Sequence, residues 1–216
     1  MKNLYIIGAG GFGREVAWLA ERINKDKSEW NIKGFIDDNE QLHDTMEGGY
    51  PVLGGCEYFD EIRDSDVWVV CAVGASAVRK KIIDKLKDKK NIHFATLIDP
   101  SVLISERVVI GEGCIICAGT IATVDIEIGA HVIINLDCTI GHDARIADFV
   151  TIYPSVNVSG FVTVGEQAEL GTGTQIIQGK NIGKAAIVGA GAVVVKDLPE
   201  KCTAVGSPAK PIKFRE

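Results

Sequence analysis

Branched aliphatic residues recur at every sixth position between Ile98 and Val194. Of the 17 positions in this register, 16 hold Ile, Val or Leu, and the remaining one is Ala122. A second column, four residues after the first, holds mostly small or β-branched residues, and Lys180 is its one clear break. A glycine often follows the aliphatic residue directly, as Gly141 does. A fixed short period of this kind is typical of a solenoid.

A period of six residues fits neither an α-helix, with 3.6 residues per turn, nor a single long strand, with two. It indicates a short strand and a corner, repeated, so that three such sides close one coil of 18 residues. The 97 residues from 98 to 194 then form a little over five coils. Strands about 4.8 Å apart would stack these coils into a prism roughly 25 Å tall. We therefore predict a parallel β-helix whose two apolar columns face inward and whose corner glycines stand where no Cβ is tolerated.

The first 95 residues alternate between strand-like and helix-like patterns. A short apolar run at 4–7 leads into Gly8-Ala9-Gly10-Gly11-Phe12-Gly13, and residues 14–20 have helical spacing. This is G-x-G-x-x-G between a strand and a helix, where glycines let backbone amides approach a phosphate at the positive end of the helix. A second strand, 32–36, ends in Asp37 and Asp38. Carboxylates about 24 residues beyond the last glycine are placed to accept hydrogen bonds from ribose hydroxyls.

A third strand, 67–74, ends in Gly74, and a helix follows from about 77 to 87. The pattern favours a nucleotide site over a small α/β packing domain whose glycines serve only a tight turn. About 90 residues make half of a dinucleotide fold, so a mononucleotide or a nucleotide-linked sugar fits better than NAD. We predict two domains: an α/β, Rossmann-like nucleotide-binding domain over 1–95 and a β-helix with a C-terminal tail over 96–216.

Composition narrows the possible partners and the compartment. The net charge of −6 argues against a general nucleic-acid surface, and no apolar run approaches the roughly 18 residues of a membrane span. The N-terminus runs straight into a strand-like segment without a signal-peptide cleavage site. Cys114 and Cys117 form a CxxC, but both fit the hexad pattern, which favours small buried thiols over a zinc site. We expect a cytoplasmic protein with reduced cysteines and no metal.

One hexad of the solenoid carries groups suited to catalysis. His142 lies two residues beyond an inward aliphatic residue and directly after a corner glycine, so it should project outward. Asp143 beside it could orient the imidazole and make it a better base. Asn135 should lie near the matching corner of the preceding side, and Gly160, one coil beyond His142, should leave space for a ligand. An ordinary surface His–Asp pair is the alternative.

The GAGGFG loop, Asp37-Asp38 and a hexapeptide β-helix with an N-x6-H-D stretch together resemble the nucleotide-sugar acetyltransferases. These are the UDP-4-amino-sugar N-acetyltransferases of bacterial glycan synthesis and the related sialic acid O-acetyltransferases. The likeness spans essentially the whole chain. It implies a left-handed β-helix, acetyl-CoA as co-substrate without a metal, a nucleotide-sugar acceptor and a homotrimer with acetyl-CoA between subunits.

The resemblance also implies roles for individual residues. His142 would be the general base, Asp143 its acidic neighbour, and Asn135 would lie at the acceptor sugar. The nucleotide would be held by residues of the N-terminal domain, namely Gly10, Gly11, Phe12, Asp37, Asp38 and Gly74. Acetyl-CoA would contact residues of the prism and its tail, namely Gly160, Thr172, Ala190 and Lys210.

One position departs from the family. Thr151 stands where many members carry a second histidine that reaches the acetyl thioester, nine residues after the base. We expect its hydroxyl to donate a hydrogen bond there instead. His131 belongs to an earlier face and is expected to be a solvated corner, and His43 and His93 are expected to be structural or solvated.

The predicted reaction is direct acyl transfer from acetyl-CoA to an amine of the sugar, with His142 removing the amine proton and backbone amides stabilising the oxyanion. Two alternatives remain at this point: acetylation of an oxygen of sialic acid, and a non-catalytic nucleotide-binding scaffold. The prism ends are expected to be covered by the N-terminal domain at one end and the C-terminal tail at the other.

Overall fold

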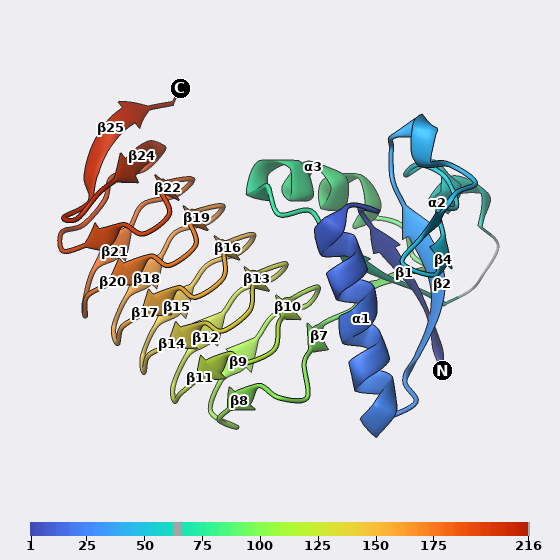
Figure 1. Ribbon diagram of the computed structural model, residues 1–216, viewed down its shortest axis with the longest axis horizontal. Coiled ribbons are helices and arrows are strands. Elements are labelled where there is room, and N and C mark those ends of the chain that lie inside the picture. The colour runs from blue at the N-terminus through green and yellow to red at the C-terminus, as the bar shows by residue number, and fades with distance from the viewer. Residues whose placement is uncertain (63–65, 216) are drawn as a thin grey trace.

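The computed structural model describes residues 1–62 and 66–215. A parallel four-stranded sheet in the order β2-β1-β5-β6 forms the centre of the N-terminal part (Figure 1). Its strands are β1 (Lys2–Ile7), β2 (Trp30–Ile36), β5 (Val67–Cys71) and β6 (Ile92–Phe94), and its longer helices are α1 (Gly11–Asp26) and α3 (Ser76–Leu86). The smaller elements are η1 (Glu40–Leu42), β3 (Met46–Glu47), β4 (Tyr50–Pro51) and α2 (Tyr58–Glu61). The predicted strand–glycine loop–helix unit is therefore present, because α1 begins directly after β1 and its loop.

Short parallel strands from residue 97 onward stack into three sheets that form the sides of a prism (Figure 1). The side that faces the N-terminal domain, here the domain side, consists of β7 (Leu97–Ile98), β10 (Ile115–Ile116), β13 (Ile133–Ile134), β16 (Thr151–Ile152), β19 (Glu169–Leu170), β22 (Ile187–Val188), β24 (Cys202–Val205) and the antiparallel β25 (Lys210–Phe214). The second side consists of β8 (Leu103–Ile104), β11 (Ile121–Ala122), β14 (Thr139–Ile140), β17 (Asn157–Val158), β20 (Gln175–Ile176) and β23 (Val193–Val194). The third side consists of β9 (Val109–Ile110), β12 (Glu127–Ile128), β15 (Arg145–Ile146), β18 (Thr163–Val164) and β21 (Asn181–Ile182).

Strand pairing follows the predicted coil of 18 residues. Ile115 pairs with Ile133, and Thr139 pairs with Asn157, in each case 18 positions apart. The predicted aliphatic column is buried from Ile116 to Val194, and the second column is buried from Cys114 to Thr174. These side chains form one continuous core inside the prism. The β-helix prediction is confirmed.

The corner glycines stand where a Cβ is not tolerated, as predicted. A glycine that directly follows an inward aliphatic residue is required by the next coil: a Cβ on Gly141 would lie 2.6 Å from the backbone nitrogen of Gly160. The left-handed backbone conformation occurs instead three residues after the inward aliphatic residue, at glycines such as Gly113 and at other residues such as Asp143 (φ 60°) and Phe161 (φ 58°). Close packing of coils, rather than an unusual φ, therefore selects the repeated glycine.

The N-terminal domain packs against the domain side of the prism. Leu97, Ile115 and Ile133 point outward from that side and share a buried cluster with residues of β1, α1 and β2. The prediction that this domain covers the end of the prism is wrong, because Ile98 and Ile104 in the first coil are only partly buried. The C-terminal tail does close the other end, where Cys202 and Ala209 belong to the prism core.

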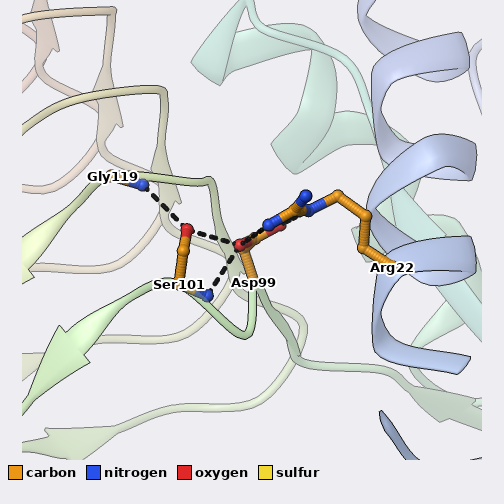
Figure 2. Close-up of polar contacts among 4 residues, drawn as sticks. All are labelled: Arg22, Asp99, Ser101 and Gly119. Atoms are coloured by element: carbon orange, nitrogen blue, oxygen red, sulfur yellow. Dashed lines mark hydrogen bonds and ion pairs between the residues drawn. The ribbon is translucent and has the colours of Figure 1, made fainter. Parts of the chain in front are cut away.

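An ion pair between a half-buried arginine and a buried aspartate joins α1 to the first coil (Figure 2). Arg22 donates to Asp99 through Nε (2.6 Å) and Nη2 (2.9 Å), and Asp99 also accepts hydrogen bonds from the backbone and hydroxyl of Ser101. The Ser101 hydroxyl in turn accepts the amide of Gly119 from the next coil. Burial alone would raise the pKa of Asp99, but the hydrogen bonds from Arg22 and Ser101 outweigh it and hold that pKa below its usual range.

The six cysteines are free, and all except Cys56 are buried. Burial raises the pKa of both Cys114 and Cys117 to about 12, as expected for thiols enclosed in an apolar environment. The prediction of small buried thiols at the CxxC is therefore confirmed. Within residues 1–62 and 66–215, no helix combines the length and apolarity needed to cross a bilayer.

Candidate active site

His142 stands at the corner between the second and third sides, directly after β14. Its Nδ1 lies 2.8 Å from Oδ2 of Asp143, and its side chain is 49% exposed. The ring edge of Phe161 packs against it, with ring centres 5.1 Å apart. Because the carboxylate of Asp143 accepts the proton on Nδ1, Nε2 keeps its lone pair and faces no partner among the described residues. The imidazole is thus oriented as an accessible base.

Gly160 lies one coil beyond His142, as predicted, but the space beside it is not vacant. A Cβ at this position would be 2.5 Å from Cε1 and 2.6 Å from Nε2 of His142. The imidazole itself occupies the volume that a side chain would need. The expectation that Gly160 leaves room for a ligand is corrected: the glycine leaves room for the imidazole of His142.

The glycine loop and the ends of β1, β2 and β5 surround a cavity of about 190 Å³. Gly13 packs directly against the backbone of Gly8, because a Cβ at position 13 would lie 1.9 Å from the carbonyl oxygen of Gly8. Gly10 and Gly11 instead face open space, since a Cβ on either would meet nothing within 4 Å. The loop is therefore packed on one side and accessible on the other, as a phosphate-binding loop requires.

The two carboxylates after β2 have different environments. Asp37 accepts the backbone amide of Ala9 through Oδ2 (2.8 Å) and that of Asn39 through Oδ1 (3.0 Å). Asp38 accepts the amide of Cys56 through Oδ1 (2.9 Å), and its carboxylate also interacts with the Cys56 thiol. Asp37 therefore joins the glycine loop to the end of β2, whereas Asp38 contacts Cys56 and lines the cavity beside the loop.

A second cavity, also about 190 Å³, lies between the glycine loop and the domain side of the prism. Four predicted binding residues line it, namely Phe12, Gly74, Asn135 and Thr151, together with Glu15 and Tyr153, which sequence reasoning missed. Asn135 uses its Oδ1 to accept the amide of Leu136 (2.7 Å), so its Nδ2 remains as a donor. Glu15 lies on α1 and Tyr153 directly follows β16, and no motif in the sequence singles out either residue.

Thr151 does not have the predicted role. It is buried on the domain side, where its hydroxyl donates to the carbonyl of Gly74 (2.7 Å) and accepts from Nη2 of Arg79 (2.9 Å). A hydroxyl held by both partners inside the domain junction cannot donate to an acetyl thioester. Arg79, fully buried beside it, was not recognised as special in the sequence, where it precedes Lys80 and Lys81 on a basic helix.

The remaining predicted acetyl-CoA residues occupy two different corners. Gly160 shares the corner of His142, whereas Thr172 and Ala190 follow β19 and β22 and share the corner of Asn135. Lys210 opens the exposed strand β25. Within one chain, the second side therefore separates the base from the cavity that contains Asn135.

His131 is not the solvated corner that we expected. It is 5% exposed, and its ring lies between Phe94 and Phe149, with centroid distances of 4.8 and 5.0 Å. Burial lowers its pKa to about 4. His43 contacts the carbonyl oxygen of Asp37 through Nε2 (2.8 Å), and His93 stacks on Trp68, so both are structural as expected.

Comparison with known proteins shows similarity over the whole chain. The PglD N-terminal domain family matches residues 3–86. A GDP-perosamine N-acetyltransferase of Escherichia coli O157:H7 is 29% identical over 98% of this chain and 97% of its own length. The acetyltransferase domain of PglB from Neisseria gonorrhoeae FA1090 superposes with a TM-score of 0.90 at 30% identity, covering 98% of this chain and all of that one.

PerB from Caulobacter crescentus, solved in complex with CoA and GDP-perosamine, superposes with a TM-score of 0.89 at 32% identity over 99% of this chain and 98% of that one. These similarities confirm the predicted fold class, including the order of the two domains. The chain therefore belongs to the hexapeptide-repeat nucleotide-sugar acetyltransferases with a PglD-type N-terminal domain.

Proposed function

We propose that this protein transfers the acetyl group of acetyl-CoA to the amino group of a nucleotide-linked amino sugar in bacterial glycan biosynthesis. The observation that carries the proposal is the exposed His142, held at Nδ1 by Asp143 and packed on Gly160. The similar proteins act on or bind such compounds, among them GDP-perosamine and UDP-N-acetylbacillosamine by name. Its proposed setting is the cytoplasm, where six free thiols are expected to remain reduced.

The groups present account for each step of the transfer. The sugar amine attacks the thioester carbonyl carbon, and His142 takes the amine proton at Nε2 as the N–C bond forms. The tetrahedral intermediate collapses with cleavage of the C–S bond, and the imidazolium returns the proton to the leaving sulfur. The products are the N-acetylated sugar and CoA with a free thiol. Holding donor and acceptor together supplies much of the rate, and the base adds about 10²–10⁴-fold.

Backbone amides at the corner next to His142 are the proposed oxyanion donors. Thr151 is not among them, because its hydroxyl is held by Gly74 and Arg79. Asp143 orients the ring without itself contacting the substrate.

The active site is proposed to form between subunits of a homotrimer. His142 lies where the second side meets the third, whereas the cavity with Phe12 and Asn135 lies where the domain side meets the second. None of the contacts within residues 1–62 and 66–215 joins the N-terminal domain to His142. A base and a sugar cleft at opposite edges of one prism side can meet when a threefold axis brings neighbouring copies together.

Complementation tests this shared site directly. His142→Ala removes the base, and Gly10→Asp places a carboxylate where the acceptor's diphosphate would approach. Gly10 is the N-cap of α1 with φ −70° and open space around a Cβ, so aspartate is compatible with the fold. Each variant alone should be inactive. When the two variants are co-expressed and mix at random, about one site in four should combine an intact His142 with an intact glycine loop and regain activity. Mixed trimers without activity, or a monomer in light scattering, would rule out the shared site.

The chemistry is tested by following CoA thiol release with acetyl-CoA and a panel of GDP- and UDP-linked 4-amino sugars, with CMP-sialic acid as the oxygen acceptor. His142→Ala should lower kcat by about 10²–10⁴-fold and leave the oligomeric state unchanged. Near wild-type turnover in this variant would overturn the role of His142. Thiol release with CMP-sialic acid alone would overturn the assignment of an amine acceptor.

A further inference from the structure

Arg79 of α3 is fully enclosed between the two domains, with 1% of its surface exposed. Its guanidinium makes six hydrogen bonds, to the carbonyl oxygens of Val73 (2.6 Å), Gly74 (3.1 Å), His131 (3.0 Å), Phe149 (2.8 Å) and Val150 (3.2 Å) and to Oγ1 of Thr151 (2.9 Å). No carboxylate is among these partners. Burial lowers its pKa to about 10, so the group remains charged at neutral pH. All its hydrogen bonds go to neutral oxygens of the two domains, and the nearby carboxylate of Glu169 attracts the charge without bonding to it. Burying a charge in this way is costly and calls for a functional reason.

The bonds from Nη1 set the direction of the segment 73–75, here called the Gly74 loop. In a trans peptide the C=O of one residue and the N–H of the next point in opposite directions. Because the carbonyls of Val73 and Gly74 both point at Arg79, the N–H groups of Gly74 and Ala75 point away from it. Neither N–H has a hydrogen-bond partner among the residues that the structure describes.

The Gly74 loop lies at the junction of the two cavities. Val73 lines the cavity with Gly8 and Asp38, and Gly74 lines the cavity with Phe12 and Asn135. In the proposed acceptor, a diphosphate joins the nucleoside to the sugar, so it must cross between these cavities. Two successive backbone N–H groups that face the same way form a favourable site for an anion.

We propose that Arg79 is a positioning residue for the acceptor, which turns the Gly74 loop so that the amides of Gly74 and Ala75 meet the diphosphate of the nucleotide sugar. The inference rests on the proposed function for the identity of the acceptor. Thr151 also orients the Gly74 loop, because its hydroxyl, on the prism, donates a hydrogen bond to the Gly74 carbonyl (2.7 Å). The next amide, that of Ser76, bonds to Glu169 of β19 (2.9 Å) and anchors the start of α3.

This arrangement differs from a purely structural link between domains. The chain offers a matched comparison, because Arg22 also joins the N-terminal domain to the prism, through Asp99. Arg22 has no contact with the Gly74 loop. Weakening either arginine should loosen the domain junction, but only the loss of Arg79 should release the carbonyls of Val73 and Gly74.

The test measures binding of GDP and UDP by calorimetry and the KM values of both substrates in the intact protein. Arg79→Lys keeps the charge but cannot reach all six oxygens, and we expect about a tenfold weaker affinity for the nucleoside diphosphate. Thr151→Val is isosteric and removes one bond to Gly74, so a loss of roughly three- to tenfold is expected. The KM of acetyl-CoA should stay within about twofold in both. Arg22→Met should lower the Tm and leave nucleotide affinity within about twofold.

Wild-type nucleotide affinity in both Arg79→Lys and Thr151→Val would overturn the proposal, and Thr151→Val decides it if the lysine variant does not fold. Equal weakening in Arg22→Met would show that general docking of the domain, not the Gly74 loop, sets affinity. A wild-type protein that binds neither nucleotide would also overturn it. Nucleotide binding without acetyl transfer would refute only the proposed function, so the two can fail separately.

Discussion

Gly160→Ala is the sharpest test of the geometry around the base. The added Cβ would lie 2.5 Å from Cε1, 2.6 Å from Nε2 and 3.0 Å from Nδ1 of His142. Carbon–carbon contacts are favourable at about 3.5–4.0 Å, so the ring must retreat by roughly 1 Å. Gly160 is not among the residues with positive φ, so alanine fits the backbone and the variant should fold.

A displacement of about 1 Å at a reacting group can lower the rate by about 10²-fold, and complete loss of a base lowers it by about 10²–10⁴-fold. We therefore expect kcat for thiol release to fall by about 10²-fold in Gly160→Ala. The KM of the nucleotide sugar should change little, because its proposed cleft lies at another corner of the chain.

A double-mutant cycle separates displacement of the ring from other effects of the methyl group. In the His142→Ala background the ring is absent, so adding Gly160→Ala should cause no further loss of kcat. Additive losses would show that Gly160 acts on the acetyl-CoA instead of on His142. Wild-type kcat in Gly160→Ala alone would refute the packing of the imidazole against this glycine.

Three further predictions concern stability, each measured by denaturant unfolding. Because the folded pKa of Asp99 lies below its unfolded value of about 3.9, its stabilisation is present above that pH and lost as pH falls through the folded pKa. Asp99→Asn should therefore be destabilised at pH 7, and its difference from the wild type should shrink as the pH falls below about 3.9. The folded pKa of His131 is about 4, whereas the unfolded value is about 6.5, so unfolding takes up a proton below about pH 6.5. The wild-type protein should therefore lose stability between pH 7.5 and 5. In His131→Phe this loss should be smaller by roughly 2 kcal/mol. Ile133→Ala leaves a cavity between the domains and should cost about 2–5 kcal/mol; a loss below 1 kcal/mol would contradict the domain junction described.

The prism could be predicted from sequence because the hexads repeat the same pattern of inward and outward residues. A residue's place in the period decides whether it faces the core, so Ile134 and Val158 could be assigned inward without any tertiary information. The sequence also contains a pattern that marks the side of the prism to which the N-terminal domain binds. Leu97, Ile115 and Ile133 recur every 18 residues at outward positions and are apolar, whereas the outward residues of the other sides are mostly polar.

The site was only partly predictable, for two physical reasons. His142 could be identified because a corner position and its neighbours in adjacent coils follow from the period. Thr151 was misassigned because its role depends on what covers its side of the prism, and that is decided by a distant domain. Arg79 was missed for the same reason, since only docking converts an ordinary basic helix residue into a buried one.

The shape of the fold explains why catalysis should require neighbouring copies. The interior of the prism is filled by its own side chains, so no cavity for a substrate remains inside it. Its outer sides are flat sheets, so a concave site must be supplied by an attached domain or by another subunit. The attached domain forms its cleft at the corner of Asn135, one full side away from His142. A single chain therefore holds the two halves of the proposed site apart, and threefold assembly is the simplest arrangement that brings a base from one copy to the cleft of the next.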